Sequence, residues 1–190
     1  QPVFQPGLID NEDMAAGFLA QMESVSRWIH LLEFSNPVSA IKKEHYSLRL
    51  FKEDGKGGWI AVEERQARND VYDRQQQEEW KRPQFRLSVT NTSSGPLWIT
   101  TAYMGFDYSI ATNYFPPIEL APGKEGFLVL AEGSLMSDTI PLMLDEKFAR
   151  LGYNEITEYL KLFISPTKIE TDKLQQEGIS LAEKFVQHKG

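Results

Sequence analysis

The chain contains no cysteine, and this removes a group of structures and mechanisms from consideration. Disulfide bonds, thiolate zinc sites and a cysteine nucleophile are all excluded within it. A cysteine-free chain suits the cytoplasm, although many extracellular β-sandwich proteins also lack disulfide bonds. We therefore expect a cytoplasmic location, with secretion as the alternative.

Positive charge is also scarce, because 27 acidic residues face 20 basic ones and the formal net charge is -7. Phosphate backbones and anionic lipid surfaces repel such a chain at long range. The sequence also lacks the run of about 18 apolar residues that a membrane-spanning helix needs. We therefore expect no nucleic-acid partner and no membrane partner.

Histidine occurs only three times, at His30, His45 and His188, and none of the three has the spacing of a metal or catalytic site. Neither HExxH, GxSxG nor a Walker phosphate loop is present. The many carboxylates are interpreted as solvated surface. We therefore expect no catalytic residue, no metal and no cofactor in this chain, and a hydrolase that uses two carboxylates is the least favoured reading.

A long amphipathic helix is predicted within an N-terminal segment, residues 1–37. Asp10 or Asn11 can cap its first turn, and Pro37 disfavours helical geometry in the residue before it. Apolar residues follow spacings of three and four, which places them in one stripe on the helix. The stripe contains Met14, Phe18, Met22, Val25, Ile29 and Leu32.

After residue 37 the apolar residues alternate with a period of two, which is typical of half-buried strands. Seven or eight short strands, separated by proline- and glycine-containing turns, predict a mainly β chain. The expected fold is an antiparallel, Ig-like β-sandwich over residues 38–170. Residues 64–82 are expected to form a long polar excursion, and 171–190 a polar tail whose pattern also permits a helix.

The clearest segment is "VTNTSSGPLWITTAYMGFDYSI", residues 89–110, which predicts a hairpin of two strands. Alternation places Leu97, Ile99 and Tyr103 on one face of the second strand and Trp98 on the other. The triplet that starts at Asn91 is a formal N-glycosylation sequon. The same residues suit a tight turn, so we interpret them as a turn.

Aromatic residues are concentrated between residues 98 and 115. Most of them are predicted to fill the core. Trp98, Tyr108 and Tyr114 are predicted to be exposed and to contact a partner, because rigid rings provide contact area at a small entropic cost. Exposed in a row, the rings near Trp98 and Tyr114 would instead suit a carbohydrate.

The segment "VSRWIHLLEFSNP" (25–37) and the hairpin at 89–110 together resemble a known type of domain. They are similar to the accessory domain downstream of the catalytic domain in bacterial caspase-like proteins of the metacaspase and orthocaspase type. The segments "ELAPGKEGFLV" and "EYLKLFIS" also match that domain, so the resemblance covers about residues 25–165. These motifs are structural, and the catalytic histidine and cysteine of the family have no counterpart here.

The resemblance implies a non-enzymatic interaction or regulatory module from a larger cysteine protease. The start at Gln1 rather than methionine agrees with a processed chain or with a piece of a longer protein. The expected partner is another protein or the parent protease domain. The alternative is a free-standing β-sandwich that binds a ligand such as a carbohydrate. The sequence leaves the oligomeric state open.

Overall fold

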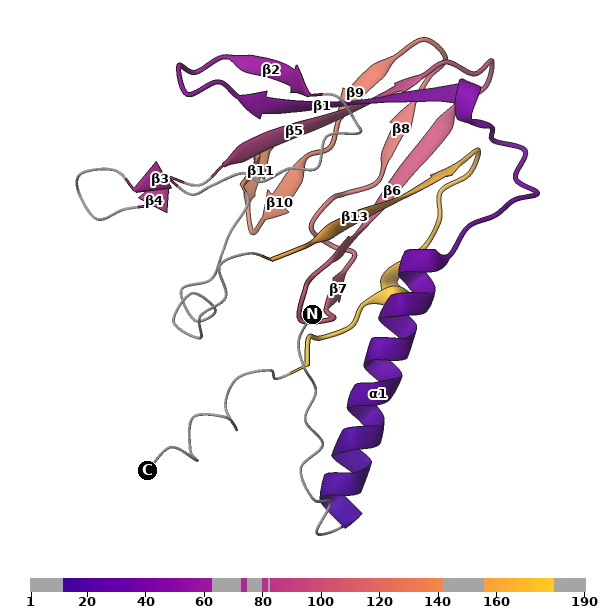
Figure 1. Cartoon of the computed structure of the whole chain (residues 1–190). Coiled ribbons are helices and arrows are strands. Elements are labelled where there is room, and N and C mark those ends of the chain that lie inside the picture. The colour runs from indigo at the N-terminus through magenta and orange to yellow at the C-terminus, as the bar shows by residue number, and fades with distance from the viewer. Residues whose placement is uncertain (1–11, 63–72, 75–79, 82, 142–155, 180–190) are drawn as a thin grey trace.

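The computed structural model describes residues 12–62, 73–74, 80–81, 83–141 and 156–179 (Figure 1). Over these residues the chain is mainly β, with one N-terminal helix and two antiparallel sheets that do not close on themselves. The mainly β class and the long helix are therefore confirmed. Residues 64–72, 75–79 and 82 of the expected excursion and residues 180–190 of the expected tail lie outside the described residues.

The first sheet is built on two long antiparallel strands, β1 (Tyr46–Glu53) and β5 (Gln84–Asn91). Strand β2 (Trp59–Val62) pairs with β1, and the short strands β9 (Glu125–Phe127) and β12 (Ile140–Pro141) pair with β5. Along β5, Leu87 and Val89 face the interior while Arg86 faces outward, as the alternation predicts.

The second sheet is built on β6 (Leu97–Met104) and the edge strand β13 (Tyr159–Ser165), paired over the full length of β13. The short strands β7 (Ile110–Ala111) and β8 (Ile118–Leu120) pair with β6 as well. Strand β13 pairs with no other described strand.

Short elements complete the described part of the chain. Strands β10 (Leu130–Glu132) and β11 (Leu135–Ser137) pair with each other, and so do β3 (Asp73–Arg74) and β4 (Trp80–Lys81), which belong to the expected excursion. Two 3-10 turns are η1 (Lys43–His45) and η2 (Asp172–Leu174). The described start of the expected tail therefore contains a single 3-10 turn, in which Leu174 packs beside the helix.

A hydrophobic core fills the space between the two sheets, which lie one above the other in Figure 1. Val89 is fully buried, and Leu97 and Ile99 are 1% exposed. The remaining buried members of this core are Leu87, Phe115, Leu120, Leu128 and Ile140. Because both sheets contribute residues, neither could bury its apolar face without the other.

Helix α1 (Glu12–Glu33) covers the other face of the second sheet. Trp28 and Leu31 pack there against Ala102, Met104 and Ile110, so both faces of β6 are buried. The helix is the longest in the described residues, yet no helix there is long and apolar enough to cross a membrane.

The C-terminal end of α1 is held by a lysine from the second sheet. Lys161 Nζ donates hydrogen bonds to the backbone carbonyls of Leu32 at 2.9 Å and Phe34 at 2.6 Å. A cation at this end of a helix is favourable because the last carbonyls carry partial negative charge. Partial burial lowers the pKa of Lys161 below its ordinary value.

The face of α1 that packs on the sheet differs from the predicted apolar stripe. Met22 and Ile29 belong to the predicted stripe but are 48% and 41% exposed. The helix buries Trp28 instead, whose ring makes edge contacts with Tyr108 and Tyr159 at centroid distances of 5.5 and 5.6 Å. These aromatic partners lie on distant parts of the chain, so helical period alone does not identify the buried face.

Asn91, at the end of β5, joins the two sheets at the hairpin that connects them. Its side chain is fully buried. Its Nδ2 donates to the carbonyls of Gly95 at 2.8 Å and Leu120 at 2.7 Å. Its Oδ1 accepts hydrogen bonds from the Ser93 backbone N–H at 2.9 Å and from the Ser93 hydroxyl at 2.7 Å. The Asn91 amide, to which a glycan would be attached, is therefore buried and hydrogen-bonded within the protein, and the turn interpretation is confirmed.

The backbone of Asn91 holds a second turn against the same hairpin. Its N–H donates to the Lys124 carbonyl, and its carbonyl accepts the Gly123 N–H, both at 2.9 Å. Gly123 has a positive φ of 72°, a conformation that favours glycine. We call Asn91, its side-chain partners and this turn the Asn91 corner.

We expect Asn91→Ala to lower the free energy of unfolding by about 3 kcal/mol or more. The change leaves the Leu120 carbonyl and the Ser93 backbone N–H without partners, at about 1–3 kcal/mol for each such group, whereas the Ser93 hydroxyl still donates to the Gly95 carbonyl at 2.9 Å. Chemical denaturation measures the loss, and Ser94→Ala, an exposed position in the same turn, is the control. A loss for Asn91→Ala no larger than that of the control would show that the corner does not hold the hairpin.

Leu97→Ala and Ile99→Ala should each cost about 2–5 kcal/mol, because each leaves a cavity in a core that has little freedom to collapse. Trp98→Ala should cost less, because Trp98 is only half-buried. Denaturant melts of the three variants provide the comparison. A larger loss for Trp98→Ala than for both neighbours would mean that the two faces of β6 are assigned the wrong way round.

Candidate functional site

Tyr103 and Glu158 form the most strongly perturbed pair of ionisable side chains in the described part of the chain. Tyr103 comes from β6, and Leu160 of β13 lies opposite it in the register. Glu158 precedes β13 by one residue, so by alternation it shares the face of Leu160. The Tyr103 hydroxyl donates a hydrogen bond to the Glu158 carboxylate.

Burial raises the pKa of both groups. The Tyr103 phenol has its pKa raised first by burial and then by the neighbouring Glu158 carboxylate, so Tyr103 stays a neutral donor. Burial also raises the pKa of Glu158, and the negative charge of Asp107 adds to this effect. The hydrogen bond from Tyr103 acts in the opposite direction, because it stabilises the ionised carboxylate.

Tyr114 connects this pair to the surface. Its ring lies 5.6 Å from the Tyr103 ring, measured between centroids, at an angle of 47°. Tyr114 is 43% exposed. Asp107 lies in the turn after β6, where its carboxylate accepts the Ser109 N–H at 3.0 Å. We call Tyr103, Glu158, Tyr114 and Asp107 the Tyr103 cluster.

The two carboxylates of the Tyr103 cluster each accept a hydrogen bond from within the protein. Two carboxylates act as acid and base only where both converge on a substrate. Here the Glu158 carboxylate accepts a hydrogen bond from the Tyr103 hydroxyl. The Asp107 carboxylate accepts a hydrogen bond from a backbone N–H of its own turn. Among the described residues, no group of three or more histidine, aspartate or glutamate side chains is placed to hold a metal ion.

The residues predicted to contact a partner do not lie on one surface. Trp98 is half-buried and lies on the opposite face of β6 from Tyr103. Tyr114 packs against Tyr103 and is the most exposed of the three. Tyr108 sits in the turn after β6, with a positive φ of 66°, and packs against Trp28 of the helix.

The outer face of the first sheet carries a cluster that sequence reasoning missed. The Arg86 guanidinium carbon lies 4.2 Å from the centre of the Trp59 ring, and Arg86 forms a 3.0 Å ion pair with Asp138. The rings of Phe51 and Phe127 lie 6.1 Å apart. We call these five residues the Arg86 cluster.

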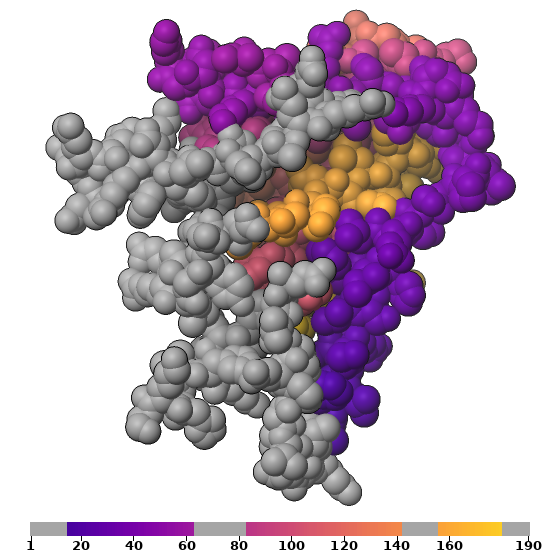
Figure 2. All heavy atoms as spheres, viewed as in Figure 1, coloured from indigo at the N-terminus to yellow at the C-terminus, as the bar shows by residue number. Residues whose placement is uncertain are grey.

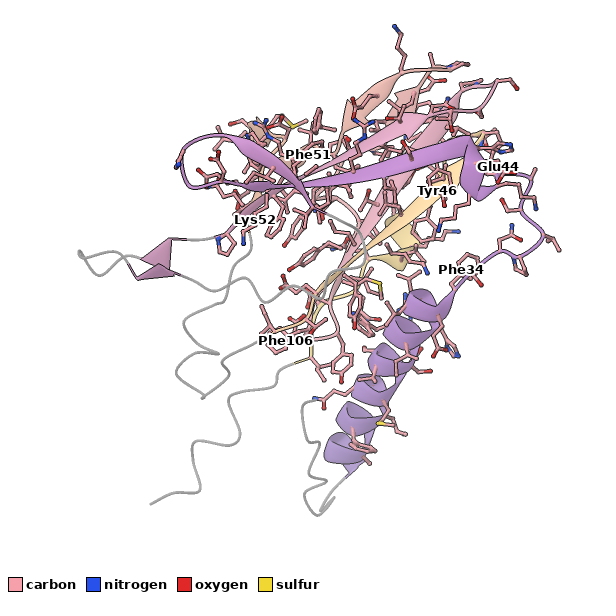
Figure 3. All side chains as sticks on the ribbon, turned by 45° about the horizontal axis from the view of Figure 1, so that its top comes forward. Phe34, Glu44, Tyr46, Phe51, Lys52 and Phe106 are labelled. Carbon is pink, nitrogen blue, oxygen red and sulfur yellow. The ribbon has the colours of Figure 1, made fainter. Side chains whose placement is uncertain are left out.

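Strand register explains why these residues meet. Phe51, labelled in Figure 3, pairs with Arg86 across β1 and β5, and Phe127 pairs with Ser88 across β5 and β9. All of them therefore point away from the core. The sequence signal was the alternation that placed Arg86 outward. The position of Trp59 additionally requires the pairing of β2 with β1, which the sequence does not reveal.

The Arg86 cluster is ordered but accessible. The side chains of Arg86 and Asp138 are 30% and 37% exposed, and all three rings are half-buried. Arg86 Nε is buried without a hydrogen-bond partner in the described residues. A cationic side chain stacked on tryptophan and fixed by a carboxylate keeps one orientation.

Comparison with known proteins shows no relationship, because no family model, no curated protein and no solved structure matches the chain. The resemblance to the accessory domain of caspase-like proteins therefore stays a prediction.

We expect the stability of the chain to depend on pH through Glu158. Its pKa is raised in the folded state, so the folded chain binds the proton more tightly than the unfolded chain does. Glu158 therefore stabilises the fold most below its unfolded pKa, near 4.5, and this contribution is lost as the pH rises through the folded pKa. The free energy of unfolding should accordingly decline across this window.

Glu158→Gln isolates this contribution. The amide oxygen still accepts the Tyr103 hydroxyl but does not ionise. As the pH rises, the Glu158→Gln variant should therefore become progressively more stable than the unmodified chain, as measured by the free energy of unfolding. Glu132→Gln, at an exposed position, is the control. Parallel stability profiles for Glu158→Gln and the unmodified chain would contradict the assignment.

Proposed function

We propose that this chain is a non-catalytic interaction module that accompanies a bacterial caspase-like cysteine protease. Its partner is another protein or the parent protease domain, and the Arg86 cluster is the contact surface. The observation that supports this proposal is the half-exposed stack of Arg86 on Trp59 at 4.2 Å. The resemblance of residues 25–165 to the accessory domain supplies the identity of the expected partner.

The composition of the Arg86 cluster favours a protein partner. Tryptophan and arginine are enriched among the residues that contribute most to protein–protein affinity. The Asp138 ion pair and the neighbouring strands already hold Arg86 in place. A partner therefore has little side-chain motion to freeze when it binds, which reduces the entropic cost of association.

We also propose that the two sheets form an Ig-like β-sandwich. Support comes from the shared core of the two open sheets and from the hairpin that passes from one sheet to the other at Asn91. In this arrangement the outer face of the first sheet is available for binding, because the shared core occupies only its inner face.

A carbohydrate-binding β-sandwich is the alternative function, and it requires exposed rings in one plane near Trp98 and Tyr114. These two residues lie on opposite sides of the second sheet, and Tyr114 is tilted by 47° against Tyr103. The arrangement therefore favours the protein partner. A carboxylate hydrolase ranks third, because nothing in the described residues places Glu158 and Asp107 around a common substrate site.

Calorimetric titration tests the proposed partner. The protease domain encoded in the same reading frame is expressed as a separate polypeptide and titrated with the 190-residue chain. Trp59→Ala and Arg86→Ala should each weaken binding about 30-fold, the loss of about 2 kcal/mol that is typical of a central interface residue. Trp98→Ala is the matched control, with the same change on the other sheet.

Two outcomes would contradict parts of the proposal. Loss of binding with Trp98→Ala or Tyr114→Ala, and none with Trp59→Ala, would move the interface to the residues predicted from the sequence. A reading frame without a histidine and cysteine dyad, together with no measurable binding, would exclude the protease partner itself.

A further inference from the structure

Among the described strands, β13 has a pairing partner at only one of its edges, and the structure indicates which of its residues face the open edge. Ile110 exchanges both of its backbone hydrogen bonds with Gln176, each at 2.9 Å. Ile110 therefore directs its N–H and C=O away from β6, and Ala111 directs its own toward Tyr103.

Alternation along β6 extends this assignment to β13. If Tyr103 faces β7, then the neighbouring residue Met104 directs its backbone groups toward β13. The β13 residues that bond to β6 are then Tyr159, Lys161, Phe163 and Ser165. Leu160, Leu162 and Ile164 consequently present their N–H and C=O groups to the open edge. No described residue hydrogen-bonds to these groups outside the pairing of the sheet.

The side chains of the same three residues lie at the border of the core. Leu160, Leu162 and Ile164 pack against it but remain partly exposed, whereas Ile99, the β6 partner of Ile164, is 1% exposed. Figure 2 shows β13, in orange and gold, at the surface between β1 above and helix α1 below. The open edge therefore combines unpaired backbone groups with incompletely covered apolar side chains.

The devices that usually protect an edge strand are weak here. Proteins protect edges with short strands, prolines or free lysines. Strand β13 has seven residues, contains no proline, and its lysine, Lys161, is bound to the carboxyl end of α1. It contains no acidic residue of its own. The edge strand β2 of the first sheet has only four residues.

The sequence of β13 is compatible with pairing to itself. In an antiparallel pair centred on Leu162, Leu160 faces Ile164 of the other copy, and Lys161 faces Phe163. Tyr159 then faces Ser165. Apolar residues meet apolar residues on the core side, and no two like charges meet. A two-fold axis through Leu162 satisfies all three open backbone positions in both copies.

We propose that two copies of this chain dimerise by pairing their β13 edges antiparallel about a two-fold axis at Leu162. The second sheets of the two copies then form one continuous sheet. This inference goes beyond the proposed function and is independent of it, because it uses the edge of the second sheet and requires no protease partner.

Sedimentation velocity of the full 190-residue chain over a range of concentrations tests the dimer. The unmodified chain should show a monomer–dimer equilibrium. Leu162→Pro removes an N–H that faces the open edge, so it spares the bonds to β6 and should weaken dimerisation by about tenfold or more. Leu162→Ala, which shortens the same side chain but keeps the N–H, is the matched control and should weaken it less.

Cross-linking tests the register and does not depend on how well the proline variant folds. Because the chain has no cysteine, Tyr159→Cys and Ser165→Cys can each be prepared as single-cysteine chains. Mixed together, they should form a disulfide between the two different chains, since the proposed register places these positions opposite each other. Each alone should cross-link poorly, because identical positions are about 20 Å apart at about 3.4 Å per residue.

Three results would overturn the proposal. The first is a chain that stays monomeric at every concentration, which would leave the edge for a strand of a different protein or for water. The second is an equal dimer affinity for the Leu162→Pro and Leu162→Ala variants. The third is cross-linking of each single-cysteine chain to itself as readily as to the other.

Discussion

The buried amide of Asn91 is the interaction on which the remaining structure depends. It lies where β5 of the first sheet passes into β6 of the second, and all its polar side-chain atoms are used within the protein. Through Leu120 it fixes the end of β8, and through its backbone it fixes the turn at Gly123. That turn leads into β9, which carries Phe127 of the Arg86 cluster. Because a buried amide without partners is costly, alternative alignments of the two sheets are disfavoured.

Two further polar side chains attach distant segments to the second sheet in the same way. Lys161 donates to the carbonyl of Leu32 in α1 and to that of Phe34 just after the helix. Gln176 donates to the carbonyls of Ser24 in the helix and Tyr108 in the turn after β6, at 3.0 and 2.7 Å. Backbone carbonyls accept all of these hydrogen bonds. Each contact therefore depends on the position of the backbone and not on the side chain of the accepting residue. The helix is thereby fixed to one face of the second sheet, which leaves the outer face of the first sheet and the edge of β13 as surfaces for other molecules.

The sequence predicts local features well because they depend on period and turn chemistry. Alternation correctly separated Leu97 and Ile99 from Trp98, and the turn at Asn91 followed from residues that hydrogen-bond locally. The buried side of the helix was not predictable in this way. Trp28 is buried because it packs on the second sheet and against Tyr108 and Tyr159, and these partners are far from it in the sequence. The Arg86 and Tyr103 clusters were missed for the same reason, since each joins strands whose register no local pattern specifies.

Native-state hydrogen exchange tests most directly whether the Asn91 corner makes the two sheets a single cooperative unit. Amide protons at Asn91 and Gly123 report on the corner, and core amides such as that of Leu128, bonded to the Leu87 carbonyl, report on global unfolding. If the account is correct, the corner amides and the core amides exchange with the same free energy of opening. Corner amides that exchange through a much cheaper local opening, while the core stays protected, would show that the sheets hold together without Asn91.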